Sequence, residues 1–167
     1  MAPRTTPADR RDRPTLARRS AAPDSLRRSD ELEKKLRDLY ARTDALFAAW
    51  TCPGSARCCQ FGLTGRQPEL WSVEGALLER SLRQRPAPKK AGAPGDCPAF
   101  DPATRRCRAY EDRPFGCRTH FCDQAQPCGK NPRSDIRALA RELAALGESA
   151  GNNVRLLPIR AWERLSD

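Results

Sequence analysis

Apolar residues recur three and four positions apart in three stretches of the chain, residues 30–50, 68–83 and 135–146. This is the spacing of one face of an α-helix. The positions that share it are Leu32, Leu36, Leu39, Tyr40, Leu46, Phe47, Trp50, Leu70, Val73, Leu77, Leu78, Leu82, Ile136, Leu139, Ala140 and Leu143. We therefore predict three amphipathic helices whose apolar stripes face a core.

Residues at the ends of these stretches suit helix ends. Ser29 or Asp30 can cap the first helix and Ser134 the third, because a side-chain oxygen there accepts a free backbone N–H. Pro68 suits the first turn of the second helix. Gly147 is expected to stop the third.

The segments between the helices are expected to be less regular. Residues 84–96 are rich in Pro and Gly and predict a loop. An Asp-Pro turn lies between Cys97 and Cys107, and it predicts a small hairpin over residues 97–110. The expected fold class is mainly α with a small hairpin, an irregular cysteine-rich module flanked by helices.

The two ends of the chain are expected to lie outside the main helical domain. Residues 1–28 contain eight Arg and four Pro but too few large apolar residues to offset the entropy cost of ordering, which predicts a disordered basic arm. A helical domain over 29–147 would follow, with the metal-binding module at 52–128. A short last helix within 148–167 would begin at Pro158 and carry Ile159, Trp162 and Leu165.

Composition at first suggests disorder in the whole chain. Leu, Ile, Val and Phe supply only 26 of the 167 residues, and the formal net charge is +10. Neither a membrane-spanning apolar run nor a sustained heptad is present, which argues against a membrane protein or a coiled coil. The charge is spread along the chain without a basic stripe interleaved with aromatic residues, so nucleic acid is not expected as the main partner.

The pairs of arginines in the first 28 residues are not followed by the apolar segment of a secretory signal. We therefore expect a cytoplasmic, reducing location. Thiols in that setting serve as metal ligands or redox groups more often than as disulfides, although a disulfide framework is an alternative.

Eight cysteines are confined to one block of the chain with the spacing C-x5-C-C-x37-C-x9-C-x9-C-x4-C-x5-C. Thiolates are soft ligands that select zinc, copper(I) or iron–sulfur clusters. Zinc and iron–sulfur clusters both take four thiolates, so the eight could serve one centre with spares or two centres fully. The candidate ligands are Cys52, Cys58, Cys59, Cys97, Cys107, Cys117, Cys122 and Cys128.

The adjacent pair Cys58 and Cys59 is the most informative detail of this block. Adjacent side chains are expected to diverge, which favours two metals or one polynuclear cluster over a single ion. The alternative is that one of the pair is a ligand and the other a buried small apolar residue. Five arginines close in sequence would offset thiolate charge, although each taken alone is expected at the surface: Arg57, Arg106, Arg108, Arg113 and Arg118.

His120 is the single histidine of the chain and lies between Cys117 and Cys122. Its imidazole could complete a shell of three thiolates or accept a proton, but with eight thiols available we do not expect it to be a ligand. No triad order, phosphate-binding glycine loop or carboxylate pair marks a hydrolase or a phosphoryl transferase.

The chain resembles the YkgJ-type cysteine cluster family, whose members are described as zinc- or iron-chelating domains. The resemblance rests on Cys52 with Cys58-Cys59, on Cys97, and on the segment Cys107-Arg-Ala-Tyr-Glu-Asp-Arg-Pro-Phe-Gly-Cys117-Arg. Cys122 or Cys128 would close the set. Many members have a further cysteine before the adjacent pair, where this chain has Pro-Gly-Ser-Ala-Arg.

The resemblance implies a metal- or iron–sulfur-binding module, with an iron–sulfur cluster slightly favoured over zinc as cofactor and the metal or cluster as the expected partner. A non-enzymatic role, structural and redox, is slightly favoured. A related cysteine domain in flagellin lysine N-methylases makes an iron–sulfur enzyme one alternative. A zinc-stabilised adaptor for another protein is the other.

Overall fold

The computed structural model describes residues 24–88, 90, 92–120, 131–150 and 156–161, with side chains described from residue 29 onward. Its helices are α1 (Asp24–Leu46), α2 (Phe61–Thr64), α3 (Ser72–Arg83), α4 (Phe115–Arg118) and α5 (Arg133–Ser149), with 3-10 turns η1 (Arg57–Cys59) and η2 (Tyr110–Asp112). Its strands are β1 (Glu69–Trp71), β2 (Phe100–Asp101), β3 (Arg106–Cys107) and β4 (Leu156–Pro158). The predicted fold class, mainly α with a small hairpin, is confirmed.

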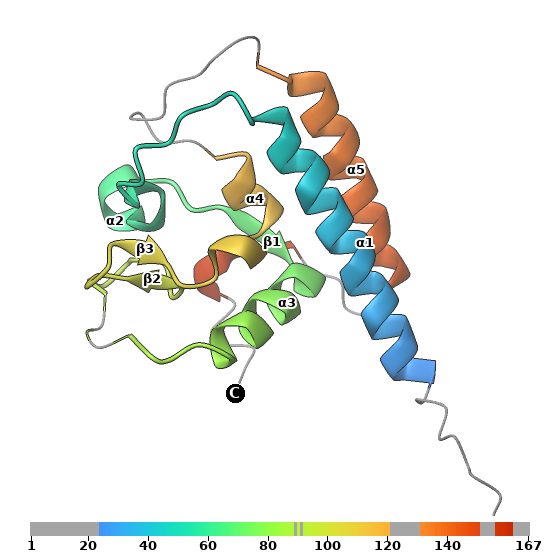
Figure 1. Cartoon of the computed structure of the whole chain (residues 1–167), viewed down its shortest axis with the longest axis horizontal. Helices are drawn as coiled ribbons and strands as arrows, with labels where there is room; N and C mark the ends of the chain where they lie inside the picture. The colour runs from blue at the N-terminus through green and yellow to red at the C-terminus, as the bar shows by residue number, and fades with distance from the viewer. Residues whose placement is uncertain (1–23, 89, 91, 121–130, 151–155, 162–167) are drawn as a thin grey trace, which may run out of the picture.

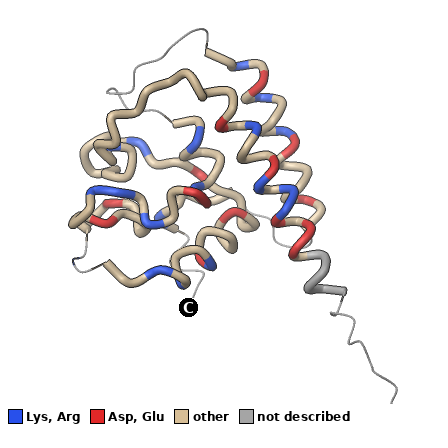
Figure 2. The backbone as a smooth tube through the Cα atoms, viewed as in Figure 1, with Lys and Arg blue, Asp and Glu red and all other residues tan. Residues whose placement is uncertain are grey.

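The two long helices, α1 and α5, lie side by side along one side of the molecule, and the shorter elements form the other side (Figure 1). Their apolar stripes meet in a cluster that also includes residues of α3 and α4. Its buried members are Leu36, Leu39, Tyr40, Leu77, Phe115, Leu139 and Leu143. The stripes read from the sequence therefore do face a core, and both acidic and basic positions occur along each of the two helices (Figure 2).

The ends of α1 and α5 differ from the ends that the sequence predicted. The first helix begins at Asp24, before Ser29, so residues 24–28 belong to a helix and the rest of the predicted arm lies outside the described residues. The last long helix begins at Arg133 after Pro132, so Ser134 is not its cap, and it continues past Gly147 to Ser149. Gly147 does not adopt the positive φ with which a glycine ends a helix.

A pair of short strands that the sequence did not predict lies before α3 and before the last turn of the described chain. Residues 69–71 form β1 and pair antiparallel with β4, with Leu70 opposite Leu157. The prediction that Pro68 starts a helix was wrong, because proline fixes φ at a value that also suits the edge of a short strand. Helix α3 starts at Ser72 instead, where the Glu74 carboxylate accepts the backbone N–H of Trp71 at 2.8 Å. Pro158 is the last residue of β4, and a 3-10 turn over residues 159–161 follows it directly.

The C-terminal pairing brings a distant residue into the centre of the molecule. Ile159 follows β4 in a short 3-10 turn, is 1% exposed, and donates its N–H to the Pro68 carbonyl at 3.1 Å. Trp162 and Leu165, also placed on the predicted last helix, lie outside the described residues.

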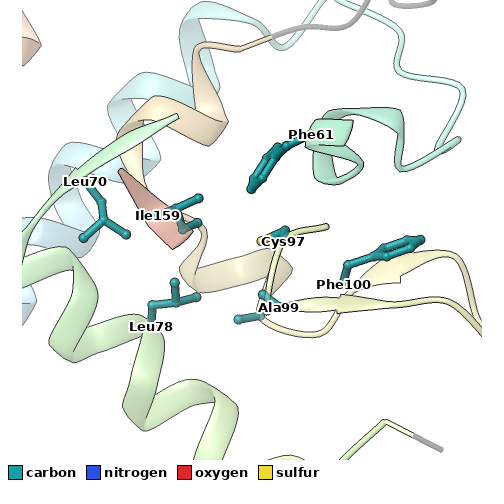
Figure 3. Close-up of a cluster of buried hydrophobic side chains, with 8 residues drawn as sticks. Phe61, Leu70, Leu78, Cys97, Ala99, Phe100 and Ile159 are labelled. Atoms are coloured by element: carbon teal, nitrogen blue, oxygen red, sulfur yellow. The ribbon is translucent and has the colours of Figure 1, made fainter. Parts of the chain in front are cut away.

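The predicted hairpin forms, with β2 and β3 antiparallel and Phe100 opposite Cys107. It packs into a second apolar cluster whose buried members are Phe61, Leu70, Leu78, Cys97, Ala99, Phe100, Ala109 and Ile159. Figure 3 shows Phe61, Cys97 and Ile159 from three separate segments gathered in this cluster. The structure thus has two small cores, one between the long helices and one around the cysteines. Within the described part of the chain, no helix combines the length and apolar character needed to cross a membrane.

Candidate metal centre

Six cysteines, the histidine and two arginines line one cavity of about 90 Å³. The thiols come from five separate segments: the chain before η1, η1 itself, the approach to β2, strand β3 and helix α4. In chain order these residues are Cys52, Cys58, Cys59, Cys97, Cys107 and Cys117. All six are free thiols. The other two predicted ligands, Cys122 and Cys128, lie outside the described residues.

Backbone hydrogen bonds hold these segments around the cavity. The N–H of Cys97 donates to the carbonyl of Cys59 at 2.8 Å, which joins the approach to the hairpin to η1. The N–H of Arg108 donates to the Ala99 carbonyl at 2.7 Å, which closes the hairpin behind Cys107. Main-chain bonds thus connect the hairpin to η1 and close the hairpin itself.

The two adjacent cysteines do not diverge as predicted. Both belong to η1, and their thiols hydrogen-bond to each other. The tight 3-10 turn differs from the extended backbone in which successive side chains alternate, so both sulfurs face the same cavity. The Cys59 thiol has a single hydrogen to donate, and its largest interaction is with Cys107.

This hydrogen bonding lowers the pKa of some thiols and raises that of another. The hydrogen bond from Cys59, helped by the positive charge of Arg113, lowers the pKa of Cys58 to about 7. The pKa of Cys107 is also lowered, again chiefly by the bond with Cys59. Cys59 itself has a raised pKa, because deprotonation would remove the hydrogen bond that its thiol donates, chiefly to Cys107, and because the side chain is largely buried. Burial raises the pKa of Cys117. Cys58 is thus ready to supply a thiolate near neutral pH.

The ligand atoms that line the cavity are of the type that a thiophilic metal prefers. Four or more sulfurs converge on one cavity, which is the chemistry that zinc and iron–sulfur clusters require. In the described part of the chain, however, no three His, Cys, Asp or Glu side chains already stand close enough together to hold an ion. The sulfurs would therefore have to come closer together to hold a metal.

Two arginines of the Cys107–Arg118 segment line the cavity and are anchored on the first helix. Arg113 stacks over the Tyr110 ring with its guanidinium carbon 4.0 Å from the centroid and pairs with Asp44 at 3.0 Å. Arg118 stacks over Tyr40 at 4.1 Å and also pairs with Asp44. For Arg118 the surface location predicted from sequence was wrong, since it is 4% exposed. Its cation lies next to the thiols, where it can offset thiolate charge.

Two residues, the buried Glu74 and Gly116, determine the position of Cys117. The Glu74 carboxylate accepts hydrogen bonds from Tyr40 Oη at 2.9 Å and from the N–H of Phe115, the first residue of α4, at 2.7 Å. A Cβ on Gly116 would lie 2.7 Å from the Glu69 carbonyl oxygen, so only glycine allows α4 to approach β1 this closely. Together they fix the turn that carries Cys117 into the cavity wall.

His120 lines the same cavity and is half-buried. Burial, and then the charge of Arg66, lowers its pKa, so the imidazole is neutral near neutral pH, the form that binds metals. The structure therefore leaves this side chain in reach of the thiols, where the sequence reasoning did not expect a ligand.

Asp44 and Glu74 are the residues that sequence reasoning missed. Asp44 and Glu74 look like ordinary polar positions of amphipathic helices, and no local signal marks them. Between Cys52 and the adjacent pair, the hydroxyl oxygen of Ser55 is buried without a hydrogen-bond partner in the described part of the chain.

Free thiols that line one cavity within a helical frame are the features of a cysteine-rich metal-binding protein. Within that class, residues 51–135, just over half of the chain, match the model of the CxxCxxCC family, described as "Putative zinc- or iron-chelating domain". The chain belongs to this family. Neither the curated proteins nor the solved structures contain a match. The resemblance noted from the cysteine spacing is thereby confirmed.

Proposed function

We propose that the chain holds a metal centre through the thiols of this cavity, an iron–sulfur cluster in preference to zinc, and that the centre is structural and redox-active. The observation that carries the proposal is the convergence of six cysteines from five chain segments on one cavity of about 90 Å³. A cluster bound there would supply one-electron chemistry.

The structural role follows from how little else joins these segments. The strands β2 and β3 contain two residues each, and η1 and α4 are single turns. Such elements are not stable alone and depend on the packing around them. Metal–sulfur bonds would join η1, β3 and α4 at one point, which adds binding free energy to folding free energy.

The adjacent cysteines and the two cavity arginines favour a polynuclear centre. Cys58 and Cys59 face the cavity together and can bind neighbouring corners of one cluster. Arg113 and Arg118 would balance the negative charge of a thiolate-bound cluster.

Anaerobic purification with metal analysis and an absorption spectrum tests the proposal. Iron with sulfide and broad visible absorption is the expected result, and a colourless zinc-loaded protein would replace the cluster with zinc. Cys107→Ser should lower the metal content, while Arg106→Ser, its exposed neighbour on β3, should leave it unchanged. A wild-type chain that binds neither metal, and stays folded with chelator and reductant present, would contradict the proposal.

A further inference from the structure

The family signature and this chain differ at one position. The spacing CxxCxxCC places a cysteine midway between the first cysteine and the adjacent pair. When the signature is laid on Cys52 and Cys58-Cys59, the second cysteine falls on position 55, where this chain has serine. Serine has the shape of cysteine with oxygen in place of sulfur, so a ligand atom is retained but its chemistry changes.

The Ser55 hydroxyl is in an unusual environment. Its oxygen is buried and has no hydrogen-bond partner among the described residues. Buried hydroxyls are nearly always paired, and an unpaired one in a native structure calls for an explanation such as an ion that completes it. This observation is independent of the signature, because it comes from the packing of the side chain and not from its place in the sequence.

The local backbone holds Ser55 next to the thiol cavity without placing it in the wall. Gly54 and Ala56, on either side, both have positive φ, of 68° and 54°. Cys52 and Cys58, which flank the segment, line the cavity, whereas Ser55 does not. A Cβ added at Gly54 would meet nothing within 4 Å, so the backbone beside Ser55 is not closely packed at that point.

We propose that Ser55 Oγ is an oxygen ligand of the metal centre, so that this chain binds metal through a mixed sulfur and oxygen set. The inference rests on the proposed function. On binding, the hydroxyl proton passes to solvent and the oxygen forms a bond to the metal without any change of oxidation state. The cavity cysteines supply the sulfur ligands.

A ligand role and a packing role for Ser55 predict different metal affinities for the Ser55→Ala variant. If the hydroxyl were only a buried group, its removal would leave metal affinity unchanged and would not destabilise the metal-free chain, since an unpaired polar atom is lost. If it is a ligand, the metal-free chain is equally stable or more stable, while affinity for the metal falls. The combination of unchanged metal-free stability and weakened binding is therefore specific to ligation.

Cobalt(II) titration of the full metal-free chain under reductant is the test, because sulfur-to-cobalt charge-transfer absorption reports how many thiolates bind. Ser55→Ala should bind cobalt about tenfold or more weakly than wild type, the scale on which even supporting groups of metal sites act. Ser55→Cys restores the family signature and should increase the charge-transfer intensity per cobalt. Ser149→Cys adds a thiol at an exposed position on α5 and should leave the wild-type spectrum unchanged.

Wild-type affinity in Ser55→Ala, with a wild-type spectrum in Ser55→Cys, would overturn the proposal while leaving the metal centre itself intact. If Ser55→Cys fails to fold, the affinity of Ser55→Ala decides alone. If the wild-type chain takes up no cobalt and contains no metal as purified, the proposed function fails and this inference fails with it.

Discussion

Asp44, near the end of α1, forms an ion pair with Arg118, whose side chain is only 3% exposed. The same carboxylate pairs with Arg113 at 3.0 Å, and both arginines line the thiol cavity. Arg118 also donates from Nε to the Arg113 carbonyl at 2.8 Å. One carboxylate therefore connects the long-helix core to the cysteine core, and the placement of α4 depends on it.

Asp44→Ala should lower the free energy of unfolding by about 2 kcal/mol, because it leaves a buried guanidinium without its carboxylate partner. The figure lies below the usual cost of breaking a buried pair, since Asp44 is 41% exposed. Urea unfolding with metal-saturated protein measures it. Asp38→Ala is the matched control on the same helix: its carboxylate is 70% exposed and pairs with Arg42, so we expect a loss of at most about 0.5 kcal/mol. Equal losses in the two variants would refute the connecting role of Asp44.

Glu74→Gln should destabilise the fold by about 1–3 kcal/mol, because an amide NH₂ replaces one of the two oxygens that accept hydrogen bonds. Glu79→Gln, on the same helix, removes only an ion pair with the exposed Arg83 and should cost much less. Chemical denaturation of both variants gives the comparison.

The loss caused by Glu74→Gln should also depend on pH. Burial raises the pKa of Glu74 above its usual value, so the folded state favours the neutral carboxyl. Its contribution to stability is complete below the unfolded-state pKa and declines as pH rises through the folded-state value. Glutamine does not titrate, so the difference between wild type and variant should be greatest in acid and shrink toward neutral pH. A difference that grows with pH would contradict this account.

Gly116→Ala should destabilise the protein by about 1–3 kcal/mol and lower its metal content, because the new Cβ would lie 2.7 Å from the Glu69 carbonyl oxygen and push α4 away from β1. Gly62→Ala is the control, since its nearest neighbour outside α2 is 3.9 Å away. Thermal unfolding and metal analysis of both variants check the prediction. Wild-type behaviour of Gly116→Ala would show that the close contact is not needed.

Alkylation of the metal-free chain should begin at Cys58. Its pKa is lowered to about 7, so roughly half of the thiol is the reactive thiolate at neutral pH, whereas burial raises the pKa of Cys117 and should protect it. Peptide mass spectrometry after a short treatment with iodoacetamide identifies the modified residues. Added metal should slow the reaction at Cys58, and modification of Cys117 before Cys58 would show that the order of acidities is wrong.

The helical frame was largely predictable because each long helix has an apolar stripe at helical spacing, and Leu36, Leu39, Leu139 and Leu143 are buried as the stripe requires. The hairpin was predictable from its Asp-Pro turn. The β1 and β4 pairing was not, because residues 69–71 and 156–158 are far apart in sequence and no local signal links short strands of three residues.

The types of residue in the site were predictable, but the contacts that hold them in place were not. Cysteine spacing indicated which residues gather, and six of them do line one cavity. The anchoring by Asp44 and Glu74 depends on how α1, α3 and α4 cross, which helical periodicity does not specify. The convergence of Cys58 and Cys59 depends on a 3-10 turn that follows the left-handed Ala56, and local propensity disfavours that conformation for alanine.

Ile159 belongs to the wall of the thiol cavity, yet it lies after every cysteine in the chain. During synthesis all eight thiols leave the ribosome before β4 exists to pair with β1, so the nascent chain presents reactive sulfurs in a pocket that lacks one side. The wall of this cavity is therefore complete only after translation of residues 156–159. Shortened products that lack these residues would carry the full set of cysteines without an enclosed site, and they would be the species most exposed to oxidation and to capture of the wrong metal.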